Sequence, residues 1–431
     1  MIYAKSRFWP DDRQNEILSG LAAYINRVRA TKTLDRERVI RALDALGRRV
    51  AAGEFDGRIA ALAAGEKAER YRAMAVRCLS RAYVEDRVRR ELCMAEEPAD
   101  APIRVELRPL GTLFHIAAGN MDGLPALSVA EGLVTGNFNI LKLPRADDGL
   151  TMEILSALCA EEPDIGDFVA VFDTPSSDVD AMLKMASLSD GIVFWGGEEA
   201  ERATRAMAPP GAKLIEWGHR LGFAYVSGDW HSGAFREDFE GLAEHIASTG
   251  QLLCSSAQVV YLDTASMEEA EDFAAYFLPM LEAASSRHPA SDMGEAAIRS
   301  VRASVSRLEA AVRRAEAGGA EGDRIRLEGR GCAVTVCRDC ALELSPLYGS
   351  ILVKRLPEKH LLPVLRRSAG VLQTAGLIAE PQERGRLTEL LLRAGVNRVT
   401  RAAHMSDLFP GEAHDGEYPL RRYMRAVNIE R

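Results

Sequence analysis

Cys254 is the residue whose type and setting best suit covalent chemistry. It stands in the segment Gly250-Gln-Leu-Leu-Cys-Ser-Ser, between a helix-like stretch and a predicted strand, and its neighbours are small and polar. A thiolate is a good nucleophile toward thioesters and aldehydes. An isolated cysteine is also commonly a buried packing residue, so the local sequence alone leaves the nucleophile and the core cysteine as two open interpretations.

Three further segments place polar or flexible residues directly after predicted strands. The segment His115-Ile-Ala-Ala-Gly-Asn ends in Asn120, whose amide could donate to a developing oxyanion. Lys142 ends an apolar strand, where its charge could meet a ribose or a phosphate. Gly196 and Gly197 separate a strand from a helix, so their backbone N–H groups could approach a phosphate or a nicotinamide. Taken singly, each segment is a weak signal, because ordinary turn and strand-end chemistry also explains it.

The remaining cysteines and histidines carry weaker signals. The spacing of Cys332, Cys337 and Cys340 is similar to a ferredoxin-type run, but no later cysteine supplies a fourth ligand. Cys332 and Cys337 also lie five apart on a predicted strand, which puts their side chains on opposite faces. We therefore expect no metal site there, and a Cys337–Cys340 redox pair is the alternative. His414, in a predicted His-Asp-Gly turn, is kept as an outside candidate because an irregular tail can cover a site.

Short apolar runs alternate with helix-like segments between residues 103 and 228. Apolar strands that alternate with helices imply a parallel sheet covered on both faces. This is a dinucleotide-type architecture, whose ligands bind beyond the carboxyl ends of the strands. The predicted strands are 111–118, 138–143, 168–172, 191–195, 213–217 and 223–226, and the predicted helices are 124–134, 148–159, 177–187 and 198–207.

The regions on either side complete a predicted division into four parts. Residues 1–102 are expected to form a helical region packed on the dinucleotide-binding domain, since apolar positions recur at intervals of three and four and Pro is absent from 11 to 97. Residues 229–403 are expected to form a second α/β domain bearing Cys254, with a loop over Gly318–Gly331. Residues 404–431 are expected to be a C-terminal tail.

Composition narrows the class of protein. The chain has 431 residues, of which 47% are hydrophobic, enough for two or three domains whose cores need neither disulfides nor metals. Its net charge of −9 argues against nucleic-acid binding. There is no run of 18 apolar residues and no signal-peptide pattern, and seven cysteines are scattered along the chain. We therefore expect a cytoplasmic protein with reduced thiols and no membrane partner.

In order and spacing, these segments resemble the acyl-CoA reductase family, which includes the fatty acid reductases of bacterial bioluminescence and belongs to the aldehyde dehydrogenase superfamily. Four motifs match in order: the Gly-Asn segment that ends at Asn120, then Gly-Asn-x-Asn-Ile-Leu-Lys142, then Trp-Gly-Gly-Glu-Glu, and then Gln-x-x-Cys254-Ser-Ser. The resemblance implies an aldehyde dehydrogenase-like α/β fold, with a Rossmann-type cofactor domain, a second α/β catalytic domain and a homo-oligomeric assembly. It implies that Cys254 is the nucleophile and that its backbone N–H and Asn120 form the oxyanion hole. It also implies that Lys142 meets the adenosine ribose and that Gly196 and Gly197 approach the cofactor.

The reaction implied by the resemblance is NAD(P)H-dependent reduction of an acyl thioester to an aldehyde. The acyl donor is acyl-CoA, an acyl carrier or an acyl-transferring partner enzyme. One departure concerns Glu216, in Glu216-Trp-Gly-His-Arg, where aldehyde dehydrogenases carry Glu-Leu-Gly-Gly-Lys. Glu216 matches the general base of the oxidising enzymes, although a thioester reductase needs no base to activate water. An oxidising aldehyde dehydrogenase and a non-catalytic nucleotide-binding subunit are therefore the alternative interpretations.

Arg145 indicates the choice of cofactor. In NAD-preferring aldehyde dehydrogenases a Glu stands three residues after the ribose-binding Lys, and here Arg145 stands three residues after Lys142. A guanidinium can bind a 2′-phosphate with two parallel hydrogen bonds. We therefore expect NADPH as the cofactor, with NADH as the alternative. The neighbouring Asp147 and Asp148 could instead neutralise Arg145 and weaken any preference.

Overall fold

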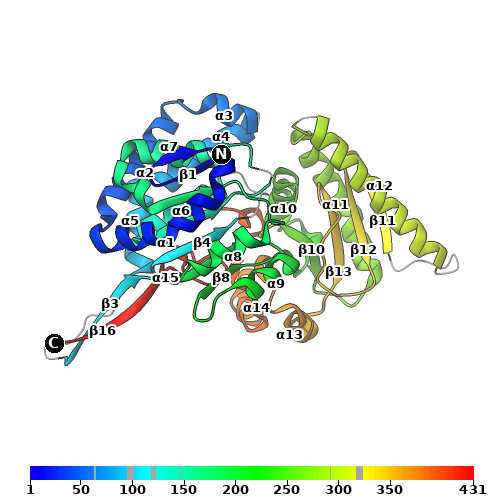
Figure 1. Cartoon of the computed structure of the whole chain (residues 1–431). Coiled ribbons are helices and arrows are strands. Elements are labelled where there is room, and N and C mark those ends of the chain that lie inside the picture. The colour runs from blue at the N-terminus through cyan, green and yellow to red at the C-terminus, as the bar shows by residue number, and fades with distance from the viewer. Residues whose placement is uncertain (63–64, 95–100, 118–122, 146, 292, 317–323) are drawn as a thin grey trace. The chain divides into compact units, whose positions relative to one another are not determined.

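The structure is a computed structural model that describes residues 1–62, 65–94, 101–117, 123–145, 147–291, 293–316 and 324–431. The chain divides into two compact units, one comprising Met1–Gly218 with Phe409–Arg431 and the other His219–Leu408. Each unit contains a seven-stranded sheet with helices packed on it (Figure 1). Among the described residues, no helix combines the length and the apolar character that crossing a bilayer requires.

The sheet of the first unit has the strand order β2-β1-β6-β5-β4-β7-β8. The strands from β4 to β8 run parallel to one another. The chain proceeds from β4 outward to β5 and β6, then returns to build β7 and β8 on the other side of β4. Ligands of such sheets bind at this reversal of strand order. The strands are β1 (Ile2–Ala4), β2 (Arg7–Trp9), β4 (Thr112–Ile116), β5 (Phe138–Lys142), β6 (Val169–Phe172), β7 (Gly191–Trp195) and β8 (Lys213–Trp217).

Helices follow the parallel strands of this sheet, as the alternating pattern predicted. The observed bounds of α6 and α9 equal the predicted ones, and β4, β5, β6 and β7 are almost entirely buried. Burial of these strands is expected because helices cover both faces of a parallel sheet. The helices are α6 (Leu124–Val134), α7 (Leu150–Glu161), α8 (Val179–Ser187) and α9 (Glu198–Met207).

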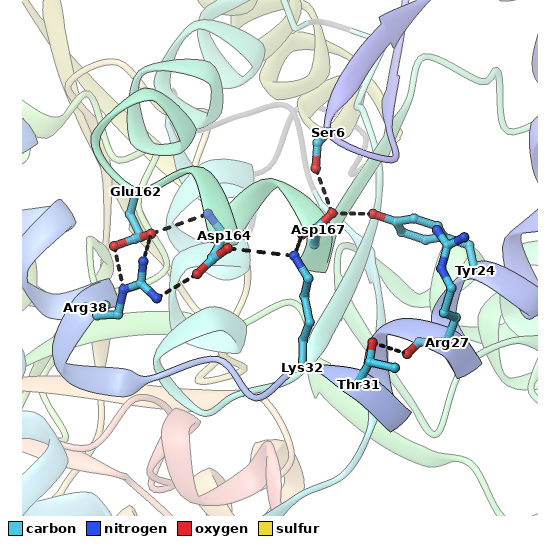
Figure 2. A network of polar contacts seen from close by, with 9 residues as sticks. All are labelled: Ser6, Tyr24, Arg27, Thr31, Lys32, Arg38, Glu162, Asp164 and Asp167. Carbon is cyan, nitrogen blue, oxygen red and sulfur yellow. Dashed lines mark hydrogen bonds and ion pairs between the residues drawn. The ribbon is translucent and has the colours of Figure 1, made fainter.

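The N-terminal helices are attached to this unit through a polar network beside β6, which Figure 2 shows. The Arg38 guanidinium donates to both carboxylate oxygens of Glu162, at 2.8 and 2.6 Å, and to Asp164 at 2.6 Å. Lys32 pairs with Asp167 in the same turn. These contacts connect the helical region to the turn that leads into β6. The helices are α1 (Gln14–Thr31), α2 (Arg36–Ala51), α3 (Asp56–Leu62), α4 (Gly65–Leu79) and α5 (Arg81–Glu91), and the turn is Pro163–Phe168.

The sheet of the second unit has the order β11-β12-β13-β10-β9-β14-β15. All of these strands except β11 run parallel to one another, and β9, β10 and β14 are buried along their whole length. The strands are β9 (Leu221–Ser227), β10 (Ala257–Leu262), β11 (Arg324–Gly329), β12 (Cys332–Cys337), β13 (Ser350–Arg355), β14 (Leu372–Ala379) and β15 (Arg398–Thr400). The helices are α10 (Arg236–Thr249), α11 (Met267–Arg287), α12 (Met293–Glu316), α13 (Glu358–Leu365) and α14 (Pro381–Ala394).

The domain boundary predicted at residue 228 is wrong. The run 223–226 belongs to β9, which pairs with β10 and β14 in the second sheet. An apolar run has the same pattern in either sheet, so only its pairing partners reveal where it belongs. The predicted tail is divided as well, since residues 409–431 return to the first unit. There β16 (Met424–Glu430) pairs antiparallel with β3 (Ile103–Pro109), and the two form a ribbon (Figure 1).

Short strands were missed in two places. The predicted helical region 1–102 begins with the hairpin β1–β2, and β1 also pairs antiparallel with β6. Three-residue strands are too short to show a period. The predicted loop 318–331 contains β11, which pairs antiparallel with β12. Its sequence Arg-Ile-Arg-Leu-Glu does alternate between charged and apolar residues. Such charges are common on edge strands, but they equally suggest a loop when the pairing partner is unknown.

Candidate functional site

Cys254 lies on the loop between α10 and β10 in the second unit. After α10 the chain reverses through Gly250 and Gln251, whose φ angles are 57° and 63°. The Cys254 side chain is exposed, whereas Cys332 and Cys337 are buried and burial raises the pKa of each thiol to about 11. The structure therefore places Cys254 within reach of a substrate, and the interpretation of Cys254 as a buried packing residue is wrong.

A glutamine amide contacts the sulfur of Cys254. Gln373, buried near the start of β14, donates from its Nε2 to the Cys254 Sγ at 3.1 Å. Its Oε1 accepts a hydrogen bond from the Thr374 hydroxyl at 3.3 Å, which directs the Nε2 toward the sulfur. A hydrogen-bond donor favours the charged form of the group that it contacts. The arrangement therefore favours the thiolate, which is the nucleophilic form of cysteine.

Buried polar side chains fix the loop that carries the thiol. Gln251 donates to the Ser345 hydroxyl at 2.9 Å and to the first carbonyl of β10 at 3.0 Å, and its Oε1 accepts from the Gly349 N–H at 3.1 Å. Gln258 donates to the Gln251 carbonyl at 2.9 Å and accepts from the Ser345 hydroxyl at 2.7 Å. Satisfied polar networks of this kind make a structure rigid. The loop of Cys254 is therefore held in place before any substrate binds.

Close packing against β9 restrains the same loop from one side. A Cβ atom on Gly222 would lie 2.6 Å from the Ser255 carbonyl oxygen and 2.8 Å from that of Ser256, so only glycine fits. A second restraint comes from Ser406, whose hydroxyl is 2.8 Å from that of Ser255. The two residues that follow Cys254 are thus held by β9 and by the segment around Ser406.

The cofactor residues predicted for the first unit lie at the carboxyl ends of its strands. Lys142 is the last residue of β5, and its ammonium donates to the Ser176 hydroxyl at 2.9 Å. Burial lowers the pKa of Lys142. Arg145 is exposed three residues further on. The nearby acids have other partners, because Asp148 binds an arginine of α3 at 3.0 Å and Asp147 accepts from groups at the start of α7. The structure therefore does not show the pairing of these acids with Arg145 that would neutralise it.

Gly196 and Gly197 connect β7 to α9, next to the reversal of strand order. A Cβ on Gly197 would meet no atom within 4 Å, whereas one on Gly196 would lie 2.7 Å from the Phe194 ring. The space beside Gly197 is thus open to a ligand. The first turn of α9 carries the exposed carboxylates of Glu198 and Glu199, which oppose an anion at this helix N-terminus. The loop therefore suits a nicotinamide or a ribose better than a phosphate.

Glu216 lies on β8 beside an aromatic cluster. Its carboxylate forms an ion pair with Arg205 of α9. The next residue, Trp217, packs against Trp195 and His414, with ring centroids 5.5 and 4.9 Å apart. The tight turn predicted at His414 is confirmed. His414 therefore packs as an aromatic ring, and the C-terminal segment covers the carboxyl ends of β7 and β8.

Asn120 falls within residues 118–122, outside the part of the chain that the structure describes, so its role in an oxyanion hole stays a prediction. The strand that leads to it is anchored by His115, whose Nδ1 is 2.8 Å from the Ser128 hydroxyl and whose Nε2 is 3.0 Å from the Asn139 Oδ1. Burial lowers the pKa of His115 to about 4, so the ring is neutral at pH 7. His115 thus has a structural role in the strand before the predicted oxyanion donor.

The cluster of Cys337, Asp339 and Glu343 has groups close enough together to share a cation, within 4.8 Å of one another. The ammonium of the fully buried Lys354 binds these acids. It donates to Asp339 at 2.6 Å, to Glu343 at 2.5 Å and to the Ala341 carbonyl at 2.8 Å. The positive charge that the two carboxylates require is therefore supplied by Lys354, and the cluster is an ion-pair network of partly exposed acids around a buried ammonium.

Comparison with known proteins identifies relatives of this chain. A family model described as acyl-CoA reductase (LuxC) matches residues 33–426. The long-chain acyl-protein thioester reductase of Vibrio harveyi is 24% identical over 164 residues, which are 37% of this chain and 34% of that protein. The enzyme of the same name from Photorhabdus luminescens is 22% identical over 340 residues, 75% of this chain and 64% of that protein. The matched segments thus span less than two thirds of the length of these relatives.

Solved structures show the same fold. The NADP-dependent glyceraldehyde-3-phosphate dehydrogenase from Bacillus halodurans C-125, complexed with NADP, superposes with a TM-score of 0.66 at 15% identity. The superposition covers 98% of this chain and 92% of that protein. The chain therefore has the aldehyde dehydrogenase-like fold that the sequence predicted, with a Rossmann-type unit and a second α/β unit.

Proposed function

This chain belongs to the acyl-CoA reductase family, and we propose that it reduces an acyl thioester to an aldehyde with a nicotinamide cofactor, through an acyl group held on Cys254. The observation that carries the proposal is the exposed Cys254 thiol on a rigid loop, with the Gln373 amide donating to its sulfur. A packing cysteine needs neither exposure nor a polar donor. A nucleophile must be accessible, and a donor to its sulfur favours the reactive thiolate.

In the first half of the proposed cycle, the Cys254 thiolate attacks the carbonyl carbon of the acyl thioester. The new C–S bond forms, the bond to the carrier sulfur breaks, and the carrier leaves as a thiolate that takes up a proton. The backbone N–H of Cys254 and the amide of Asn120 are the proposed donors to the oxyanion. Each such donor lowers the barrier by about 3 kcal/mol in comparable sites.

In the second half, the acyl group on Cys254 is reduced by two electrons and leaves as an aldehyde, and the thiolate of Cys254 is restored. When bound, a reduced nicotinamide supplies the hydride for this step. The first unit fits such a cofactor, because the open side of Gly197 lies at the reversal of strand order. We propose that Lys142 binds the adenosine ribose and that Arg145 binds the 2′-phosphate, which makes NADPH the preferred cofactor.

Glu216 is not required as a general base in this cycle, since no water attacks the acyl-enzyme. Its ion pair with Arg205 is consistent with that view, because the carboxylate is already bound by a guanidinium. An oxidising aldehyde dehydrogenase would need such a base, and this reaction is the second candidate function.

The acyl donor is proposed from the relatives and from the surroundings of the thiol. The curated relatives are named for long-chain acyl groups carried on a protein. Leu252 and Leu253, the two residues before Cys254, expose 49% and 40% of their surface, which offers an acyl chain apolar contacts beside the thiol. We therefore propose a long-chain acyl group, delivered by acyl-CoA, by a carrier protein or by an acyl-transferring partner enzyme.

The proposal is tested by intact-mass analysis after mixing the protein with acyl-CoAs of increasing chain length. We expect a mass increase of one acyl group in the unmodified protein and none in Cys254→Ala. Cys93→Ala, which removes the other exposed cysteine, is the matched control and should acylate normally. Addition of NADPH should then remove the acyl group and release aldehyde.

Three other results would overturn the proposal. Acylation that persists in Cys254→Ala would place the nucleophile elsewhere. Free acid formed from an aldehyde and NADP⁺, with no reduction of thioesters, would show the oxidising enzyme. Absence of any acyl adduct, with the acyl-CoA panel and with an acylated carrier protein alike, would favour a non-catalytic nucleotide-binding subunit.

A further inference from the structure

Helix α12 of the second unit exposes a continuous apolar stripe. Ile298, Val301, Val305, Leu308 and Val312 recur at intervals of three and four residues, and each is between 47% and 65% exposed. These five residues are called the α12 stripe below. Apolar residues alternating at three and four positions form the seam along which two helices pair in a coiled coil. On an isolated surface helix the same residues would be expected to face the core.

The opposite side of α12 is the side that packs on its own unit. Arg299 donates to the His288 carbonyl at 3.0 Å, the Ser306 hydroxyl accepts from Arg326 at 3.1 Å, and Arg307 pairs with Glu328 of β11 at 2.8 Å. The least exposed positions of the helix are small or polar rather than apolar. The α12 stripe is thus directed away from the contacts that hold the helix, and no rotation about the helix axis can bury it without breaking them.

We propose that the α12 stripe is an interface with a second copy of this chain, in which the two α12 helices pair antiparallel about a twofold axis near Val305. The charges beside the stripe indicate this partner. Arg302 and Glu309 flank the stripe at equivalent positions, seven residues apart, and both are exposed. In an antiparallel pair, Arg302 of one copy faces Glu309 of the other, and the twofold axis creates this ion pair twice.

Parallel pairing offers no such complementarity. There Arg302 and Glu309 would face the other flank of the stripe, which carries Ala297, Ser304 and Ala311. Neither Arg302 nor Glu309 forms an ion pair within the described part of the chain, so both are available to a partner. The small residues on the other flank allow the two helix backbones to approach closely. The α12 stripe, the charges beside it and the small residues therefore all fit an antiparallel α12 helix of a second copy.

The first experiment measures the mass of the full chain by sedimentation equilibrium, at concentrations up to about 100 µM. We expect a self-association step that is lost in the double variant Val305→Glu/Leu308→Glu, so that the average mass falls twofold. Leu392→Glu, which changes an exposed apolar residue of α14, is the matched control and should associate like the unmodified chain. Circular dichroism checks that the variants keep their helix content. An average mass that is the same in the double variant and the unmodified chain overturns the proposal.

The second experiment tests the orientation of the two helices by exchanging charges. Arg302→Glu places two carboxylates together at each of the two contacts, and should raise the dissociation constant roughly tenfold, since two exposed ion pairs are lost and replaced by repulsion. Glu309→Arg should do the same. The combination Arg302→Glu/Glu309→Arg restores both pairs and should bring the dissociation constant back to that of the unmodified chain. Antiparallel self-pairing is refuted by either of two results. In one, the combined variant loses as much binding free energy as the two single variants together; in the other, none of the three variants changes the dissociation constant.

Discussion

Replacing Gln373 by leucine removes a side-chain donor to the Cys254 sulfur, while it keeps most of the side-chain volume. The Gln373 Nε2 lies 3.1 Å from the Sγ. A hydrogen bond to a charged group contributes about 1.5–3 kcal/mol, so its loss should reduce the ionisation constant of the thiol by roughly tenfold to hundredfold. At any pH where the thiol is mostly protonated in both proteins, the thiolate fraction should fall by the same factor.

The rate at which Cys254 is alkylated should fall by a smaller factor than the thiolate fraction. A more basic thiolate is intrinsically more nucleophilic, with a Brønsted coefficient of about 0.4–0.5. This offsets roughly half of the logarithmic loss, so alkylation of Cys254 by iodoacetamide at pH 7 should slow by about four- to fifteenfold. At a pH above the thiol pKa of both proteins, Gln373→Leu should react as fast as the unmodified protein or faster, by up to about tenfold.

The crossing of the two rate profiles separates this effect from simple damage to the site. A misplaced loop would make the thiol slower, or faster, by the same factor at every pH. The assay follows alkylation of Cys254 by intact mass from pH 6 to pH 10, in a Cys93→Ala background so that one exposed thiol reacts. Thr374→Val, which removes the hydroxyl that orients the amide, should show a smaller shift in the same direction. Identical profiles for Gln373→Leu and the unmodified protein would refute the reasoning.

Four further outcomes follow from the site and the fold. Asn120→Ala should slow acylation roughly a hundredfold or more with little change in cofactor binding; an unchanged acylation rate rejects the oxyanion role. Arg145→Ala should lower the NADPH-to-NADH ratio of kcat/KM about tenfold or more, and an unaltered ratio removes Arg145 from the cofactor site. Gly222→Ala should lower the acylation rate by roughly a hundredfold, because the new Cβ would lie 2.6 Å from the Ser255 carbonyl oxygen; normal acylation would show that the loop can move. Burial lowers the pKa of both His115 and His245 to about 4, below the value of about 6.5 in the unfolded chain. The unfolded state therefore binds more protons between these values, so stability should be lost as pH falls from 6.5 toward 4, by about 1.4 kcal/mol per pH unit for each histidine. Urea midpoints that stay constant from pH 7 to pH 5 contradict this, and His115→Gln should flatten the dependence.

The parts of the fold that the sequence predicted are those whose signal is local. The helices α6 and α9 have the predicted bounds because apolar periodicity and flanking glycines lie within a few residues of each end. The sequence assigns β9 to the wrong sheet, because its pairing partners, β10 and β14, are distant along the chain. The hairpin β1–β2 was missed because strands of three residues show no period.

The same distinction holds within the candidate site. Cys254 could be proposed from its own segment and from the resemblance. Gln373 could not, because it is 119 residues away in the chain and sits within an ordinary buried strand. Gln251 belongs to the motif Gln-x-x-Cys254-Ser-Ser. Its contacts with Ser345 and Gly349, however, depend on a segment 94 to 98 residues later that folds back beside the loop. Residues that support a nucleophile are thus found from tertiary contacts, even where the nucleophile is found from sequence.

The residues proposed for acylation and those proposed for cofactor binding lie mostly in different units, so their effects can be tested separately. The contacts described for Cys254 and its loop all come from residues 219–408, whereas Lys142, Arg145 and Gly197 belong to the first unit. Changes at Gln373 or Gly222 should therefore alter acylation without changing cofactor affinity, and changes at Arg145 should do the reverse. Asn120 is the exception, because it belongs to the first unit and is proposed to serve the acylation step. An acylation rate that depends on Asn120 would thus support its predicted role in the first half-reaction, before any hydride is transferred.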